Sequence, residues 1–221
     1  MSETTAPLDV EAQVLARATS VAGIDEVGRG ALAGPVMVGV TLVTALTPPP
    51  RGCIDSKKLT ATRRKSLVPE IHQWAHAYGV GAASAEEIDQ WGLRICLALA
   101  AERAIDACGQ QPEVVLIDGP LNLLRPALDV TLGSPPLPEF RFRDLDVIPV
   151  VGGDAASATI AAASILAKVA RDELMSEVAA EFPEYEWDGN KGYGSARHLD
   201  AIAKHGPTPL HRRSWNLPGA S

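Results

Sequence analysis

Three apolar stretches of this sequence end in acidic residues. Asp25 and Glu26 follow "VAGI", Asp118 follows "VVLI", and Asp154 follows "VIPVVGG". The carboxyl ends of neighbouring parallel strands lie at one edge of an α/β sheet, where such sheets bind their ligands. We therefore expect the four carboxylates to lie close together at that edge.

Neighbouring carboxylates repel one another and need protons or cations to offset their charge. Oxygen donors suit Mg²⁺ or Mn²⁺, which keep several waters and take further ligands from a substrate phosphate. Two such ions can hydrolyse a phosphodiester, because one orients the attacking hydroxide and the other stabilises the leaving oxygen. A simpler explanation, a turn residue or helix cap, would suffice for Asp118 or Asp154 alone. The same chemistry at three strand ends favours the metal site.

Gly28, Arg29 and Gly30 follow the first acidic pair directly. A Gly-x-Gly turn after a strand could begin a dinucleotide-binding fingerprint, so a nucleotide-dependent enzyme is an alternative. The next glycine, Gly34, is one position late for that fingerprint, and the adjacent carboxylates would repel a pyrophosphate. The turn fits better beside a metal-bound phosphodiester, where glycines allow close backbone approach to a sugar and the arginine contacts a phosphate.

Charge is unevenly distributed along the chain. The formal net charge of −7 argues against general polyanion binding. A local phosphate-binding surface is nevertheless expected within residues 189–213. Its basic residues are Lys191, Arg197, Lys204, Arg212 and Arg213, beside His198, His205 and His211 and against Asp200 alone. Lys57 and Lys58, in a proline-marked loop, are further candidates for phosphate contact, although a solvated lysine pair is the usual explanation.

Composition predicts a soluble intracellular protein located in the cytoplasm. The three cysteines are too few and too scattered for a disulfide framework, which favours a reducing compartment. The polar, acidic N-terminus lacks the features of a secretory signal. The longest uncharged apolar run, residues 31–46, is too short to span a bilayer, so no membrane association is expected. A monomer is expected, since no long apolar stripe demands association.

The succession of expected elements predicts an α/β fold with a mixed sheet and helices packed on it. Strands are expected at 21–25, 35–44, 78–84, 113–119 and 147–154, and helices at 60–76, 84–107 and 157–182. Ser84 and Glu87 form a capping-box pattern, and Thr60 is a candidate helix cap. Lys168 and Asp172 have the i,i+4 spacing of a surface ion pair.

One main domain is expected for 221 residues. Residues 1–19 form a tail or a short helix, 20–183 the core, and 184–221 a C-terminal segment. The proline-rich stretch at about 121–146 is an insertion. Three more acids, Asp129, Asp144 and Asp146, lie in the insertion, but none of them ends a comparable strand.

The succession of motifs resembles the ribonuclease HII family, the type 2 ribonucleases H. The motifs that carry the resemblance are "GIDEVGRGALAGPV", "DSKKLT", "VLIDG", "GGDAASATIAAASILAKVARD", "NKGYGSARHLDAIAKHG" and "HRRSW", in the family order over about residues 21–215. The resemblance implies an RNase H-like fold with a helical C-terminal extension that holds the duplex. In the fourth acidic motif, Gly152 stands where the family commonly has lysine.

The resemblance also implies roles for individual residues. Asp25, Glu26, Asp118 and Asp154 would be the catalytic, metal-binding acids, with two Mg²⁺ or Mn²⁺ ions in the substrate complex. The turn at 28–30 would recognise the ribose 2′-hydroxyl, the one group that distinguishes RNA from DNA at a given sugar. Tyr193 would stack on the sugar beside the RNA–DNA junction, although an aromatic residue between glycines can also simply fill a loop.

The implied activity is metal-dependent endonuclease cleavage. Its partners would be RNA/DNA hybrids and duplex DNA containing ribonucleotides, cut on the 5′ side of a ribonucleotide to leave a 3′-hydroxyl and a 5′-phosphate. Such cleavage would remove misincorporated ribonucleotides from DNA. The alternative from another class is a hybrid-binding module without catalysis.

Overall fold

The computed structural model describes residues 4–119, 122–125 and 135–219. Five strands form one mixed sheet in the order β3-β2-β1-β4-β5. The strands are β1 (Val21–Val27), β2 (Val36–Val43), β3 (Ala77–Ala83), β4 (Val114–Asp118) and β5 (Asp146–Val150). β1 pairs with β2 and β2 with β3 in antiparallel fashion, whereas β4 runs parallel to both β1 and β5. The mixed α/β sheet predicted from the sequence is confirmed.

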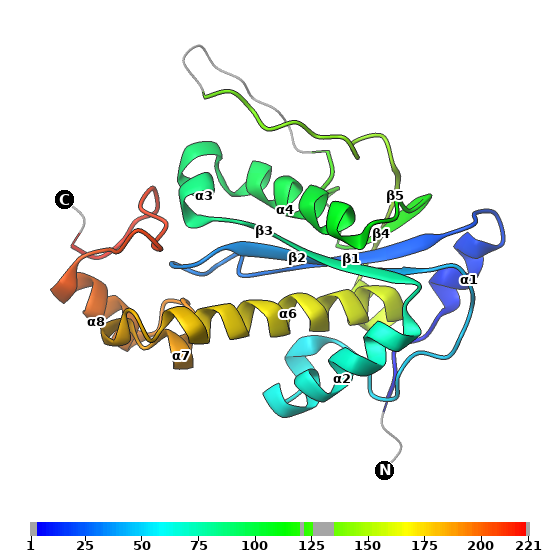
Figure 1. Ribbon diagram of the computed structural model, residues 1–221, viewed down its shortest axis with the longest axis horizontal. Helices are drawn as coiled ribbons and strands as arrows, with labels where there is room; N and C mark the ends of the chain where they lie inside the picture. Colours follow the sequence, from blue (N-terminus) through cyan, green and yellow to red (C-terminus); the bar gives the residue numbers. More distant parts are fainter. Residues whose placement is uncertain (1–3, 120–121, 126–134, 220–221) are drawn as a thin grey trace.

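Helices cover both faces of this sheet and both of its ends (Figure 1). The α-helices are α1 (Asp9–Leu15), α2 (Ala61–Trp74), α3 (Ala85–Trp91), α4 (Leu93–Cys108), α5 (Gly153–Ala156), α6 (Ala158–Val178), α7 (Trp187–Asn190) and α8 (Ala196–His205), and the short 3₁₀ helices are η1 (Ser56–Lys58) and η2 (Pro183–Tyr185). In Figure 1, α3 and α4 lie above the sheet and α2 and α6 below it, with α7 and α8 at the end that carries the C-terminus. Within the described ranges, no helix is long and apolar enough to cross a bilayer.

Local sequence signals account for most helix boundaries. Ser84 and Glu87 form the predicted capping box of α3, and Thr60 accepts a hydrogen bond from the Arg63 N–H at the start of α2. The single helix predicted over 84–107 is wrong, because Gly92 adopts a positive φ of 79° and divides it into α3 and α4. A glycine tolerates this backbone conformation at no steric cost.

Small residues bring α6 close to the sheet, as its alanine-rich sequence indicated. A Cβ atom on Gly39 of β2 would overlap the Ala163 carbonyl, and one on Gly23 of β1 would overlap the backbone at Thr159 and Ile160. On the opposite face, a core of branched strand residues packs against α4. The three central strands, β2, β1 and β4, are therefore largely buried on both sides and form a rigid support for whatever follows them.

The N-terminal helix α1 closes one end of the molecule. Its Glu11 is completely buried and accepts hydrogen bonds from the Ser157 hydroxyl (2.7 Å) and from the Thr159 N–H (2.9 Å) and hydroxyl (2.8 Å). These groups lie at the start of α6, where unpaired backbone N–H groups favour a negative charge. Glu11 therefore fixes the junction between α5 and α6.

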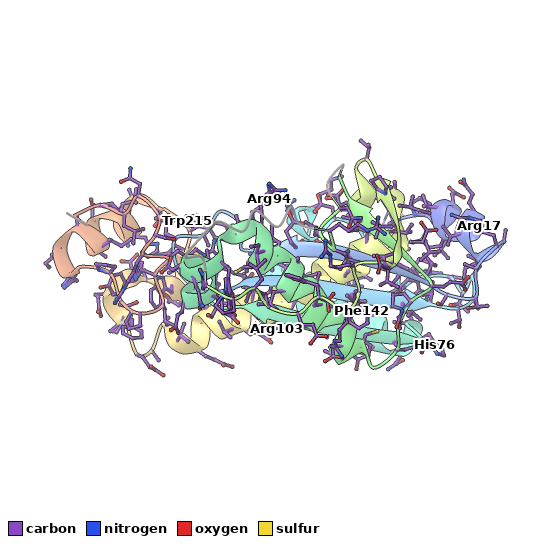
Figure 2. All side chains as sticks on the ribbon, turned by 90° about the horizontal axis from the view of Figure 1, so that it is seen from above. Arg17, His76, Arg94, Arg103, Phe142 and Trp215 are labelled. Carbon is purple, nitrogen blue, oxygen red and sulfur yellow. The ribbon has the colours of Figure 1, made fainter. Side chains whose placement is uncertain are left out.

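The insertion predicted at about 121–146 lies partly outside the described residues, as does Asp129. Its last residue, Asp146, begins β5. The described part that precedes β5 runs along α4, where buried Glu102 accepts hydrogen bonds from the N–H groups of Arg141 (3.0 Å) and Phe142 (2.7 Å). Figure 2, seen from above α3 and α4, shows Phe142 beside α4, with Trp215 toward one end of the molecule and Arg17 at the other.

The C-terminal segment has a small core of its own, built on aromatic rings. Trp187 is fully buried, and its indole N–H donates to His198 Nε2 (3.0 Å). The Thr208 N–H donates to His211 Nδ1 (2.9 Å), so neutral His211 carries its proton on Nε2 and donates to His198 Nε2 (3.1 Å). His198 in turn donates from Nδ1 to the Tyr193 carbonyl (2.9 Å). Both imidazoles are thereby satisfied in the neutral form.

The hydrogen bonds of His198 and His211 predict that the folded protein loses stability in acid. Burial, with the charges of His198 and Arg213, lowers the pKa of His211 from 6.5 to about 4. The unfolded chain binds this proton more readily, so the contribution of His211 is complete above pH 6.5 and is lost as pH falls toward 4. The loss amounts to on the order of 3 kcal/mol.

Urea denaturation of the wild type and His211→Asn at pH 7 and pH 5 measures this loss. Asn can still accept from the Thr208 N–H but does not titrate, so the stability advantage of the wild type should shrink at pH 5. His205→Gln, which alters an exposed histidine of the same segment, should leave the pH dependence unchanged. An advantage that is the same at both pH values contradicts the assignment.

Candidate active site

Sheet register brings two of the predicted acids together. Ile24 of β1 lies opposite Ile117 of the parallel strand β4, so Asp25 and Asp118 emerge side by side, one residue further along. Asp154 does not end a strand directly, since β5 stops at Val150 and Asp154 lies in the short helix α5. The N–H of Gly153 donates to Asp118 Oδ1 (2.7 Å), which fixes α5 against the end of β4.

Asp25 is the most perturbed of these acids. It is only 8% exposed, and burial raises its pKa from 3.8 to about 7. The Ser164 hydroxyl and the Glu26 N–H (2.9 Å) donate to the carboxylate and oppose the shift, whereas the charges of Glu26 and Asp118 add to it. Glu26 itself is half-buried and lies 3.6 Å from the Arg29 guanidinium. The folded chain therefore holds Asp25 close enough to Glu26 and Asp118 for their negative charges to repel one another.

Asp154 belongs to the same electrostatic neighbourhood. Its pKa is raised first by burial and then by the charges of Asp55 and Asp118, while Lys57 and Lys58 lower it. The two lysines are exposed, and buried Asp55 accepts a hydrogen bond from the Lys57 N–H at the start of η1 (2.9 Å). The structure thus places the predicted phosphate-contacting lysines beside the fourth acid.

The donor set suits hard divalent cations by its chemistry. It consists of carboxylate oxygens, which Mg²⁺ and Mn²⁺ prefer, and a cation would relieve the repulsion that raises the pKa values of Asp25 and Asp154. Over the described ranges, no three His, Cys, Asp or Glu side chains are placed so as to hold one ion. Asp25, Glu26 and Asp118 each interact with a protein donor or cation through one oxygen, which leaves their second oxygens available as ligands.

The turn after β1 contains two glycines with different surroundings. Gly28 is buried with a φ of +82°, and a Cβ atom there would overlap Arg171 Nε. Gly30 is exposed, and a Cβ atom there would meet nothing within 4 Å. Arg212 stabilises the turn, because its guanidinium donates hydrogen bonds to the carbonyls of Gly28 (2.6 Å) and Arg29 (2.9 Å). Arg29 and Gly30 are exposed, so this part of the turn is accessible to a substrate.

Tyr193 lies near this turn and beside α6. The residue is 36% exposed, and its ring faces two cations of α6, with Arg171 Cζ 5.3 Å and Lys168 Nζ 5.9 Å from the ring centroid. Lys168 also forms the predicted ion pair with Asp172 (2.7 Å). A side chain that merely fills a loop would be buried, so the exposed ring fits a contact surface better.

Sequence reasoning missed three residues that shape the site, namely Asp55, Ser164 and Arg171. It also expected Arg212 on a phosphate-binding surface, which is wrong, because this side chain is fully buried and donates to the carbonyls of Gly28 and Arg29. Asp55 follows no strand, and so the pattern of strand-ending acids could not find it. Arg171 could have been found from helical periodicity, because it occupies the same buried stripe of α6 as Ala167 and Met175. A charged residue on such a stripe needs buried partners, and here they are backbone carbonyls.

A mixed sheet of this order, with helices on both faces, is the fold of the ribonucleases H. The structure matches ribonuclease H2 from Pyrococcus horikoshii OT3 with a TM-score of 0.67 at 24% identity, covering 89% of this chain and 94% of that one. It matches Bst-RNase HIII in complex with Mn²⁺ with a TM-score of 0.66 at 21% identity, covering 95% and 71% of the two chains. These two similarities show the fold.

The chain belongs to the ribonuclease HII family, whose model matches residues 22–217. It is 47% identical over 197 residues to the ribonuclease HII of Ruegeria sp. (strain TM1040), covering 89% of this chain and 78% of that protein. The chain is thus a ribonuclease H, an endonuclease of a family that depends on divalent metal ions.

Removing the charge at Asp25 should stabilise the fold while abolishing activity. The folded-state pKa is raised from 3.8 to about 7, so the charged carboxylate disfavours the folded chain above pH 7, and the penalty disappears as pH falls toward 3.8. Asp25→Asn should therefore raise the free energy of unfolding at pH 8 by up to about 4 kcal/mol, with little gain at pH 4.

Thermal unfolding in the presence of a chelator measures this gain. Adding Mn²⁺ should then raise the unfolding temperature of the wild type but not that of Asp25→Asn, because only the wild type keeps all four carboxylates. An Asn variant less stable than the wild type at pH 8 would show that the carboxylate is not under electrostatic strain.

Replacing each of the two glycines of the turn by alanine should separate an effect on stability from an effect on activity. Gly28→Ala should cost about 2 kcal/mol or more, because it combines a left-handed backbone with an overlap against Arg171. Gly30→Ala should change stability by less than about 0.5 kcal/mol. It should still lower cleavage at least about 10-fold if a ribose approaches this backbone closely. Urea denaturation and initial cleavage rates check both, and full activity of Gly30→Ala would remove Gly30 from the contact surface.

Proposed function

We propose that this ribonuclease H cleaves the phosphodiester on the 5′ side of a ribonucleotide, in RNA/DNA hybrids and in DNA duplexes with embedded ribonucleotides. The products would carry a 3′-hydroxyl and a 5′-phosphate. One observation carries the proposal. Strand β1 carries Asp25 and Glu26 just before its last residue, Val27, and runs directly into the turn at 28–30, so the acids and the turn that would contact the sugar are adjacent.

The carboxylates provide the chemical part of this proposal. Asp25, Glu26, Asp118 and Asp154 would hold two Mg²⁺ or Mn²⁺ ions in the substrate complex. When bound, the ions would activate a water molecule for attack on phosphorus and stabilise the leaving oxygen. Lys57 and Lys58 would bind the neighbouring phosphate, which their position beside Asp154 supports.

Sugar recognition would come from two segments that lie along α6. The turn with Gly28, Arg29 and Gly30 would contact the 2′-hydroxyl, and Tyr193 would stack on the sugar beside the RNA–DNA junction. Lys168 and Arg171, the two cations that face Tyr193, lie on α6 four and seven residues after Ser164, whose hydroxyl interacts with Asp25. In an α-helix these separations correspond to about 6 and 10 Å along the axis. This spacing supports recognition of a nucleotide next to the bond that is cut.

We also propose the division of labour along the chain. Residues 20–183 would form the catalytic core, with 184–221 as the substrate-binding segment. Exposed basic residues of α8, Arg197 and Lys204, support duplex contact there, although Arg197 is also paired with Glu186 (3.3 Å). The enzyme would act as a monomer in the cytoplasm. Among the described residues, the large exposed apolar side chains Leu46, Tyr78, Val151 and Tyr193 lie on separate elements, and the three cysteines are free.

A nicking assay tests the proposal. Wild-type protein with Mg²⁺ or Mn²⁺ should cut a labelled DNA duplex that contains one ribonucleotide at the bond on its 5′ side, as located on a sequencing ladder. Asp118→Asn should lower the rate at least about 100-fold, because it removes a ligand oxygen at the reacting phosphate.

Asp144→Asn is the matched control, since it removes an acid with a fully exposed side chain from the insertion and should keep the wild-type rate. Cleavage at another bond would refute the assigned position of the cut. Tight hybrid binding without any cleavage would favour the silent binding module instead.

A further inference from the structure

Arg171 joins two loops that are distant in the sequence. It lies on α6 with no exposed surface, and its guanidinium donates to three backbone carbonyls. Nε and Nη2 donate to Pro35 (2.9 Å) and Ala33 (3.0 Å), which follow the turn at 28–30. Nη1 donates to Lys191 (2.9 Å), two residues before Tyr193. One side chain thus holds both of the segments that would contact the sugar.

The surroundings of Arg171 are unusual for a buried charge. In the part of the chain that the structure describes, no Asp or Glu oxygen lies within 4 Å of its guanidinium nitrogens. Its charge is compensated by carbonyl dipoles, by the face of the Tyr193 ring, 5.3 Å away, and by the more distant charge of Asp172. A buried charge without a carboxylate partner is costly, and well-packed apolar residues often stabilise a fold as well or better. Stability alone therefore does not explain an arginine here.

The contacts around Arg171 leave little freedom between the two loops. The Leu32 N–H donates to the Gly192 carbonyl (2.8 Å), and a Cβ atom on Gly192 would overlap the Ala33 carbonyl. Gly28 packs against Arg171 Nε without room for a side chain. The planar guanidinium is thus enclosed by the turn on one side and by the Tyr193 loop on the other.

We propose that Arg171 is a positioning residue that locks the turn at 28–30 and Tyr193 into one recognition unit, so that both contact the same ribonucleotide step. This inference rests on the proposed function of the two segments. It assigns to Arg171 no contact with the substrate. It predicts that Tyr193 contributes fully to catalysis only while the guanidinium holds its loop against the turn, so that most of this contribution is lost when the guanidinium is replaced.

A double-mutant cycle tests whether the contribution of Tyr193 depends on Arg171. Arg171→Lys keeps a cation under the ring, but a single ammonium group cannot reproduce the planar fork that reaches both loops. On a duplex with one ribonucleotide, Tyr193→Ala should lower kcat/KM about 100-fold in the wild-type background and less than about 5-fold in the Arg171→Lys background.

Lys168→Met provides the matched control, because Lys168 also faces the ring but bonds neither loop. In that background Tyr193→Ala should keep its full effect. Additive losses from Arg171→Lys and Tyr193→Ala would overturn the proposal, as would equal coupling of Tyr193 to Lys168.

Folding is checked by circular dichroism and by the thermal unfolding temperature. Arg171→Gln, which retains two donors, replaces Arg171→Lys if the latter does not fold. Failure of both variants to fold would assign Arg171 to stability and overturn the proposal. Failure of the proposed function gives a different result, namely a wild type that does not nick the duplex at all.

Discussion

The close packing of α6 against β1 and β2 is the constraint on which the site depends. Glycine in the strands and alanine in the helix bring the two backbones into contact, so side chains of α6 reach each functional segment directly. Ser164 bonds Asp25, Arg171 holds the turn after β1, and Lys168 and Arg171 face Tyr193. A bulkier interface would separate these supports from the groups that they position.

Burial at this interface places the acids under electrostatic strain. Asp25 lies at the end of a buried strand, where removal from water and two neighbouring negative charges raise its pKa to about 7. Helices packed on both faces of the sheet keep this carboxylate buried despite the cost. The same repulsion between carboxylates favours the binding of divalent cations, because a cation offsets the negative charges. The arrangement that destabilises the metal-free protein therefore strengthens metal binding.

The sequence predicted the sheet and the location of the acids because both follow from local patterns. Branched residues mark the strands, and parallel pairing of β1 with β4 brings Asp25 and Asp118 to one edge. Gly28 and Gly30 could not be distinguished in this way, because their difference comes from Arg171, more than 140 residues away. Arg171 was missed and Arg212 was wrongly expected at the surface for the same reason, since their partners are carbonyls of distant loops. The division at Gly92 was missed because a lone glycine within a periodic helix pattern is usually tolerated.

The buried carboxylate of Glu11 has a consequence for how the chain can be shortened or fused. Residues before the first strand resemble a dispensable leader, yet Glu11 neutralises the opening turn of the helix that carries most of the site's supports. Trimming the protein to the residues from the first strand onward would leave buried Ser157 and Thr159 groups without their acceptor, at a cost of about 1–3 kcal/mol for each such group. An N-terminal fusion partner is compatible with the enzyme only if the junction precedes α1, because this helix is an integral part of the catalytic scaffold.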